Sequence, residues 1–153
     1  MLGSFTLRTD GGARGNPGPA GAGFVIEDAS GAIVRSGGRY LGVATNNVAE
    51  YEALVWGLQT ALDHGIRRIE VRADSELVVR QVNGHYKVKN AGLIPLHKAS
   101  CELLKRFESA RVMHVRREEN VAADDLANRA MDARETIGDG VAPGAGGQTS
   151  LFG

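Results

Sequence analysis

The fold is decided by the residues from Thr9 to Gly23, which read Thr-Asp-Gly-Gly-Ala-Arg-Gly-Asn-Pro-Gly-Pro-Ala-Gly-Ala-Gly. Residues 5–9 alternate between apolar and polar side chains, which predicts a β-strand that ends at Asp10. The glycines that follow allow a sharp turn and a close approach of the backbone to another molecule. A carboxylate beside bare backbone suits a metal ion held against phosphate, and an ordinary Asp-Gly turn is the competing interpretation.

Length and composition indicate one globular domain. The chain has 153 residues, of which 42% are hydrophobic and 24% charged, so it can form a real core. Its 18 basic and 18 acidic residues balance, so net charge argues neither for nor against a polyanionic partner. The single cysteine excludes an intrachain disulfide framework. Without a long apolar run or a signal-peptide pattern, we expect a cytoplasmic monomer that does not associate with membranes.

The first third of the chain predicts an antiparallel meander. After the first strand, residues 21–28 form a second apolar run, and residues 28–31 carry a hairpin signal. Residues 32–41 then predict a third strand, with a bulge at Gly37 and Gly38.

The rest of the chain alternates between helical and strand patterns. Strand–helix–strand crossovers require parallel pairing, so the predicted class is α/β with a mixed five-stranded sheet, an antiparallel meander plus parallel strands, flanked by helices. The Gly-rich composition from Ile137 predicts a domain over residues 1–136 and a flexible tail over 137–153. The further elements are a helix from residue 45 to Gly65, a strand at 66–74, a helix at 75–82, a loop at 84–92, a helix at 93–108, a strand at 111–116 and a helix at 121–135 capped by Asn120.

Four carboxylates occupy places where they could meet. Asp10 and Asp74 each close a predicted strand, and parallel neighbours would bring both to one sheet edge. Glu50 lies in the first turn of one helix and Asp124 one turn into another. Each also has a local explanation: Glu50 in a capping box with Asn47, Asp74 as a helix cap, and Asp124 as favourable charge near a helix N-terminus. Spacing alone does not show that the four converge.

Four segments resemble the type 1 ribonuclease H family, and they occur in the family's order. They are residues 9–19, 45–50, 73–75 and 120–127. The resemblance covers residues 2–134 and implies the ribonuclease H-like fold, with a catalytic metal site formed by Asp10, Glu50, Asp74 and Asp124.

The resemblance also implies a reaction. The family's enzymes are endonucleases that hydrolyse the RNA strand of RNA–DNA hybrids by two-metal-ion catalysis, with two Mg²⁺ ions or Mn²⁺, and leave 5′-phosphate and 3′-hydroxyl ends. When empty, the clustered carboxylates should repel one another, and some of their pKa values should rise. The alternative is a protein of this fold that binds hybrids or double-stranded RNA with altered or no cleavage.

By the same resemblance, residues around the first two acids bind the hybrid. A ribose 2′-hydroxyl both donates and accepts hydrogen bonds, so backbone groups and amides can recognise it. The alternative to hybrid binding for Asn46 or Asn47 is that its side chain caps the following helix. The family's pocket for a DNA phosphate is matched by Thr45 together with Asn16. The hybrid-binding residues implied are Gly11, Gly12, Asn16, Asn46 and Asn47.

The chain departs from the family at three places. The loop at 84–92 is short and lacks the basic, Trp-containing protrusion of some members, although Lys87 and Lys89 could contact phosphate or simply be solvated. Residues 114–120 leave little room for the family's His-bearing loop, so His114 should lie in a strand. Arg116 or Arg117 would then take over part of that loop's role. The third departure is Glu76, where many members have Gln.

The end of the chain carries a short motif. Gln148, Leu151 and Phe152 resemble the peptide by which bacterial replication proteins dock on the sliding clamp, with two apolar side chains entering a pocket. The alternative is a tail without a partner.

Overall fold

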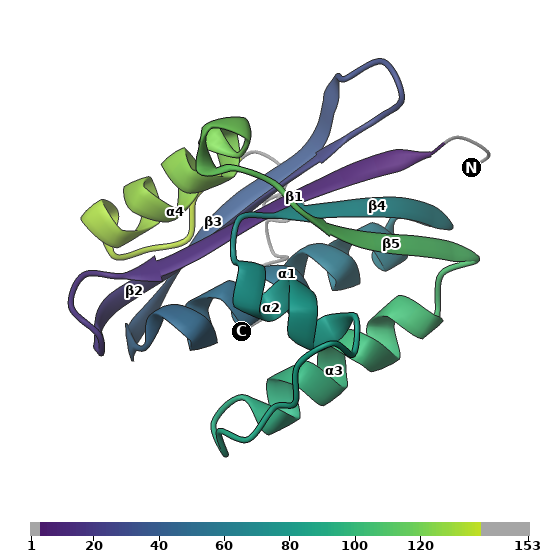
Figure 1. The fold of residues 1–153 in the computed structure, drawn as a ribbon. Coiled ribbons are helices and arrows are strands. Elements are labelled where there is room, and N and C mark those ends of the chain that lie inside the picture. The colour runs from purple at the N-terminus through teal and green to yellow at the C-terminus, as the bar shows by residue number, and fades with distance from the viewer. Residues whose placement is uncertain (1–3, 139–153) are drawn as a thin grey trace.

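The computed structural model describes residues 4–138, which form one mixed sheet flanked by helices (Figure 1). The strand order is β3-β2-β1-β4-β5. Strands β1, β2 and β3 pair antiparallel, whereas β4 pairs parallel with both β1 and β5. The predicted α/β class, a meander joined to parallel strands, is therefore confirmed. The strands are β1 (Phe5–Ala13), β2 (Gly18–Glu27), β3 (Ile33–Ala44), β4 (Arg68–Ala73) and β5 (Ser109–His114).

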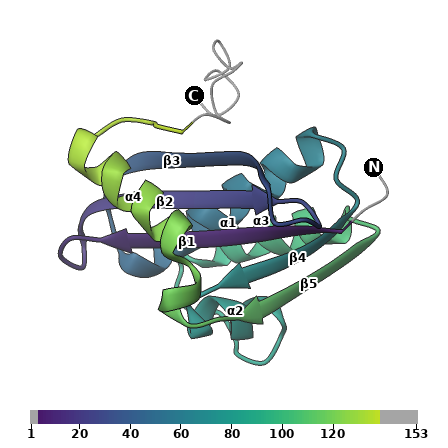
Figure 2. The same cartoon turned by 90° about the horizontal axis from the view of Figure 1, so that it is seen from above.

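The helices cover both faces of this sheet. α1, α2 and α3 lie on one face, and α4 lies alone on the other (Figures 1 and 2). Within residues 4–138 no helix combines the length and the apolar character needed to cross a membrane. The helices are α1 (Asn46–Asp63), α2 (Glu76–Val82), α3 (Ile94–Lys105) and α4 (Val121–Ala133), with a 3-10 turn at Arg117–Glu119.

The main core lies between the sheet and α1. Leu7 and Phe24 from the sheet and Trp56 from α1 are almost completely buried. The Phe24 and Trp56 rings meet edge to face, with centroids 4.8 Å apart, an arrangement that adds to the hydrophobic stabilisation. Burying apolar surface contributes about 25 cal/mol of free energy per Å², and this stabilises the packing of α1 on the sheet.

Strand β1 is longer than predicted. We expected it to end at Asp10, and this is wrong: the strand continues to Ala13, because β2 supplies partners for Gly11 and Gly12. The chain turns only at residues 14–17. Asp10 therefore lies inside the strand, paired with Gly23 of β2, one residue after the last pair between β1 and β4.

The predicted bulge at Gly37 and Gly38 is also wrong. Both residues pair in regular register, with Phe24 and Gly23. The register shifts lie elsewhere, between Ala20 and Gly21 and between Ile26 and Glu27.

Glycine is needed on this face because α4 lies close to the sheet. A Cβ atom on Gly38 would lie 2.3 Å from the carbonyl oxygen of Leu126, and one on Gly23 would lie 2.3 Å from that of Ala123. Any side chain on these two strand residues would push α4, and with it Asp124, away from the sheet.

The chain returns to the sheet after α4. Ile137, the first residue of the predicted tail, bridges Gly38 through two backbone hydrogen bonds of 2.8 and 2.9 Å. The proposed clamp-binding residues Gln148, Leu151 and Phe152 lie outside the described residues.

Candidate active site

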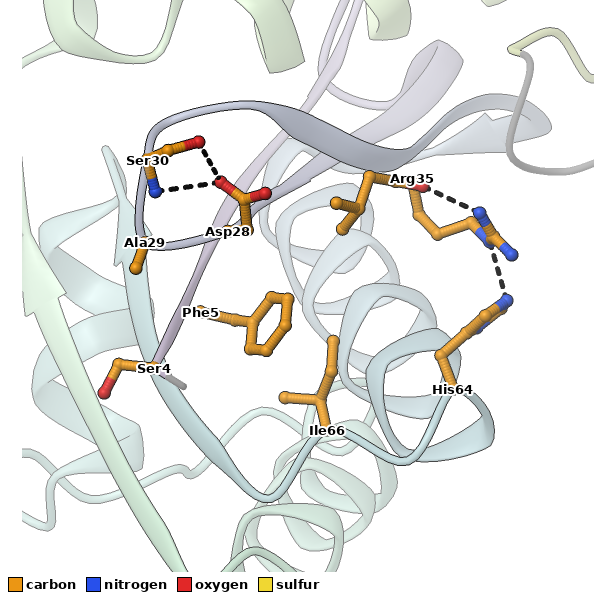
Figure 3. A pocket seen from close by; sticks show the side chains of 9 residues that line it. Ser4, Phe5, Asp28, Ala29, Ser30, Arg35, His64 and Ile66 are labelled. Atoms are coloured by element: carbon orange, nitrogen blue, oxygen red, sulfur yellow. Dashed lines mark hydrogen bonds between the residues drawn. The ribbon is translucent and has the colours of Figure 1, made fainter. Parts of the chain in front are cut away.

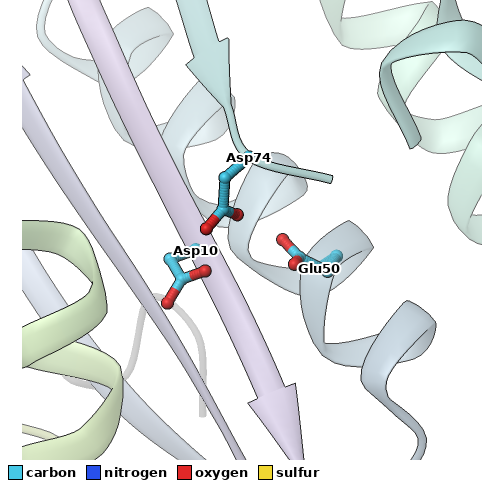
Figure 4. Close-up of side chains that lie close together, drawn as sticks. All are labelled: Asp10, Glu50 and Asp74. Carbon is cyan, nitrogen blue, oxygen red and sulfur yellow. The ribbon is translucent and has the colours of Figure 1, made fainter. Parts of the chain in front are cut away.

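Three of the four predicted acids come together at the centre of the sheet. Carboxylate oxygens of Asp10, Glu50 and Asp74 lie within 4.8 Å of one another (Figure 4). They come from β1, from α1 and from the residue that follows β4. Asp124 of α4 lines the same hollow, which has a volume of about 410 Å³. The fold thus gathers acids from four separate segments.

Other residues supply the helix caps near these acids. α1 is capped by Thr45, whose Oγ1 accepts a hydrogen bond from the amide of Val48 at 3.2 Å. The capping-box interpretation of Glu50 with Asn47 is therefore wrong, as is a capping role for Asn46. α2 is capped by Ser75, so the interpretation of Asp74 as that cap is wrong as well. The carboxylates of Glu50 and Asp74 are left to face Asp10.

Burial and mutual repulsion perturb the acids, as predicted. Burial, followed by the charges of Glu50 and Asp74, raises the pKa of Asp10 to about 10, and hydrogen bonding with the Asp124 and Asp74 carboxyls adds to the shift. Burial and the charge of Asp74 hold the pKa of Glu50 well above its usual range, although a hydrogen bond from the Gly11 backbone opposes this. Ionising these carboxyl groups at the same time costs free energy, because their charges repel one another, unless a cation binds between them.

The donor set fits a divalent metal ion. All its members are carboxylates, the hard oxygen ligands that Mg²⁺ and Mn²⁺ prefer. The Oδ1 atom of Asp74 is buried and has no hydrogen-bond partner among the described residues. Within the described part of the chain, Arg117 forms an ion pair with one of the four acids: its Nη2 lies 3.8 Å from Oδ1 of Asp124, on a side chain that is 77% exposed. That contact is too loose and too exposed to neutralise the buried acids.

Comparison with known proteins identifies the family. A family model described as "Reverse transcriptase-like" matches residues 8–130. The Ribonuclease HI of Halobacterium salinarum is 45% identical over 123 residues, 80% of this chain and 62% of that protein. A crystal structure of RNase H1 from the same archaeon is 43% identical with a TM-score of 0.83, covering 86% of this chain and 99% of that one. The chain belongs to the type 1 ribonuclease H family.

Two further proteins are similar to most of this chain. LC11-RNase H1, crystallised in complex with an RNA/DNA hybrid, is 43% identical with a TM-score of 0.80, covering 85% of this chain and 98% of that one. A bifunctional protein of Mycobacterium tuberculosis is 44% identical over 128 residues, 83% of this chain but 35% of that protein. The chain thus spans between one third and two thirds of the length of these curated relatives.

Asn16 and Asn46, two of the residues that the family resemblance assigned to hybrid binding, form a hydrogen-bonded rim beside the acids. The Oδ1 atom of Asn16 accepts a hydrogen bond from the amide of Asn46 at 3.0 Å, and Oδ1 of Asn46 accepts from the amide of Ala13 at 2.8 Å. These bonds tie the β1–β2 turn to the start of α1. Gly12 and Asn46 line the hollow, and Asn47 lies half-buried in the next position of α1.

The basic residues that were predicted to contact phosphate or to replace the His-bearing loop lie in two places. Arg117 lines the hollow, whereas Arg116 is exposed just before the 3-10 turn. Lys87 and Lys89 are exposed on the loop between α2 and α3, away from the residues that line the hollow. His114 is the last residue of β5, as predicted for this short form of the family.

Residues that sequence reasoning missed also line the hollow. Arg14 forms an ion pair of 2.7 Å with Asp132 of α4, and one of its guanidinium nitrogens lies 3.4 Å from the side-chain oxygen of Asn128. Arg14 and Asn128 both line the hollow. No local pattern distinguishes them from ordinary surface residues.

A second hollow of about 570 Å³ lies at the opposite end of the sheet (Figure 3). Phe5, Ile66 and Val34 give it an apolar lining, and Arg35 and His64 meet across its rim in a 2.6 Å hydrogen bond. It contains none of the four clustered acids. Although it is larger, the described residues place no cluster of carboxylates there that could hold a divalent metal ion.

The raised pKa of Asp10 predicts how stability depends on pH. The folded protein keeps a proton on Asp10 up to about pH 10, whereas the unfolded chain loses it near pH 4. The free energy of unfolding of the metal-free protein should therefore fall as the pH rises from about 4 to about 10. Asp10→Asn should flatten this slope and raise the free energy of unfolding of the metal-free protein at pH 8 by about 1–3 kcal/mol.

Thermal unfolding in EDTA at pH 5 and pH 8 checks this. Asp125→Asn is the matched control, because Asp125 is an exposed residue of α4 that pairs with Arg129. The same pH slope in Asp10→Asn and wild type would contradict the prediction.

Proposed function

We propose that the protein is a metal-dependent endonuclease that hydrolyses the RNA strand of RNA–DNA hybrids and leaves 5′-phosphate and 3′-hydroxyl ends. One observation carries this proposal: three carboxylates from β1, from α1 and from the residue after β4 converge within 4.8 Å. One of their oxygens is buried and has no hydrogen-bond donor within residues 4–138. The hybrid bound to the related LC11-RNase H1 supports the choice of substrate.

Asp10, Glu50, Asp74 and Asp124 would hold the metal ions, Mg²⁺ or Mn²⁺. Two divalent ions held by carboxylates supply an activated water molecule and stabilise the leaving oxygen of a phosphodiester. The chain itself contributes a fixed arrangement of ligands. Asp10 is held within a strand, and the backbone of Gly11 hydrogen-bonds the Glu50 carboxylate and so orients it.

The rim would select the hybrid. Gly12 and Asn46 line the hollow beside the acids, where a minor groove carrying 2′-hydroxyl groups could be recognised. Asn16 accepts a hydrogen bond from the amide of Asn46. Thr45 directly precedes Asn46, so it would share a phosphate contact with Asn16. Gly11 would act mainly through Glu50, and Asn47 would extend the contact along α1.

Basic side chains outside the rim would contribute less. Lys87 and Lys89 would meet phosphates of the bound hybrid, so binding should weaken as salt increases. Arg117 would exchange its contact with Asp124 for one with a product phosphate, the role that the family's His-bearing loop has in product release.

A cleavage assay tests the function. Labelled RNA–DNA hybrid, double-stranded RNA and double-stranded DNA of one sequence are each incubated with Mg²⁺, with Mn²⁺ or with EDTA. We expect the RNA of the hybrid alone to be cut, no cutting in EDTA, and products that a polymerase can extend from their 3′-hydroxyl ends. Hybrid binding without metal-dependent cleavage would indicate a protein that binds hybrids but does not cut them. Equal cutting of double-stranded RNA would indicate a nuclease with a wider range of substrates.

A further inference from the structure

Asn120 is a fully buried polar residue in the connection between β5 and α4. Asn120 occupies the predicted N-cap position of α4, but its side chain makes no hydrogen bond to the first turn of that helix. Its Nδ2 atom instead donates a hydrogen bond of 2.7 Å to the carbonyl oxygen of Thr9, and lies 3.5 Å from that of Arg72. The side chain thus joins β1 and β4 rather than the first turn of its own helix.

These contacts lie where the catalytic strands begin to separate. Thr9 and Ala73 form the last backbone pair between β1 and β4. The next residue along each strand is an acid of the cluster, Asp10 on one and Asp74 on the other. The amide of Asn120 therefore links the two strands immediately before their acids.

Asn120 also sets the position of the fourth acid. Its backbone carbonyl accepts the hydrogen bond of the Asp124 amide at 3.0 Å, in the first turn of α4. One residue is thus in direct contact with β1 and β4 and begins the helix that carries Asp124. The bond between Asn120 and Thr9 joins residues that are 111 positions apart in the chain.

The orientation of the amide indicates that a donor is required here. Oδ1 of Asn120 is buried without a hydrogen-bond partner among the described residues. Rotating the amide by half a turn would place this oxygen against the carbonyl oxygens of Thr9 and Arg72, which would repel it. Leaving a buried acceptor unpaired destabilises a protein, so a residue that only filled space here would be apolar.

We propose that Asn120 is a positioning residue of the acidic site, whose amide keeps Asp10, Asp74 and Asp124 at the separation that divalent metal ions require. This inference rests on the metal-dependent function proposed above. The clustered carboxylates repel one another, and the Asn120 bond opposes the separation of the strands that carry two of them. Residues that orient metal ligands typically change metal affinity by 10–100-fold when replaced.

Two substitutions distinguish the effect of losing the hydrogen-bond donor from the effect of changing the shape of the side chain. Asn120→Ala removes the whole amide, and Asn120→Asp keeps the shape but replaces the donor by an acceptor. Asn120→Ser keeps one donor and serves as the truncated variant if Asn120→Ala does not fold. Leu103→Ala is the control for lost stability alone, because Leu103 is a core residue of α3, on the opposite face of the sheet from α4.

Mn²⁺ affinity is measured by calorimetry, and hybrid cleavage is measured across a series of Mn²⁺ concentrations. We expect the apparent Kd for Mn²⁺ to rise about tenfold or more in Asn120→Ala and Asn120→Asp. Part of the lost cleavage should return at high Mn²⁺, whereas Leu103→Ala should keep wild-type affinity while its Tm falls.

Wild-type Mn²⁺ affinity in both Asn120 variants would overturn the proposal, even if their Tm falls, because the role would then be structural. A wild-type protein that binds no Mn²⁺ and cuts no hybrid would instead remove the function on which the proposal rests. The two failures are distinguished by the wild-type measurement.

Discussion

Asp10→Asn should abolish hybrid cleavage, lowering kcat by about 10³-fold or more. Asp10 is the most enclosed acid of the cluster, with 7% of its surface exposed, and it faces both Glu50 and Asp74. The substitution keeps the shape of the side chain and removes the charge that would bind a cation. A 10³-fold loss corresponds to about 4 kcal/mol of transition-state stabilisation. Single-turnover cleavage of the labelled hybrid, with saturating Mg²⁺, measures it.

Substitutions of the other three acids should cause losses of cleavage that differ in size. Glu50→Gln and Asp74→Asn should cause losses like that of Asp10→Asn, because their oxygens lie in the same 4.8 Å group. Asp124→Asn should be the mildest, since Asp124 lies outside that group at the edge of the hollow. Asp125→Asn is its matched control and should cleave like wild type. Cleavage by Asp10→Asn at the wild-type rate would refute the active-site assignment.

Gly11→Ala should destabilise the protein by about 3 kcal/mol, at the upper end of the cost of overpacking a core. A Cβ atom at Gly11 would lie 2.2 Å from the carbonyl oxygen of Ala49 and 2.6 Å from the amide nitrogen of Glu50. These are backbone atoms of a buried helix, so they cannot move aside as a flexible side chain would. α1 would have to shift, and the Glu50 carboxylate would move away from Asp10.

The neighbouring residue provides the control. Gly12 is also in β1, but a Cβ there would first meet the side-chain oxygen of Asn46, at 3.8 Å, an ordinary contact distance. Gly12→Ala should therefore leave the midpoint of urea unfolding nearly unchanged, whereas Gly11→Ala lowers it. Equal midpoints for the two variants would show that α1 does not pack against Gly11 as described.

Much of this protein could be predicted from its sequence because the relevant signals are local. The alternation that places Ile69 and Val71 on one face of β4, and the helical spacing that places Leu54 and Leu58 in the core, depend on neighbouring residues. Together these patterns predicted the order of elements and the mixed sheet. The four acids were identified by family motifs, which preserve residue type and spacing without showing distances.

Tertiary structure decided which backbone segments touch. Local rules made Asp10 the end of a strand and Asn120 a helix cap, but β2 extends the strand past Asp10, and the amide of Asn120 bonds to Thr9. The family motif marks Gly11 without showing that α1 packs directly against it, where a Cβ atom would meet the backbone of Ala49. The sequence by itself determined which acids and which elements the chain has. Their convergence into one site came from packing between segments far apart in the chain, because a carboxylate or amide finds its partner only after the sheet and helices have assembled.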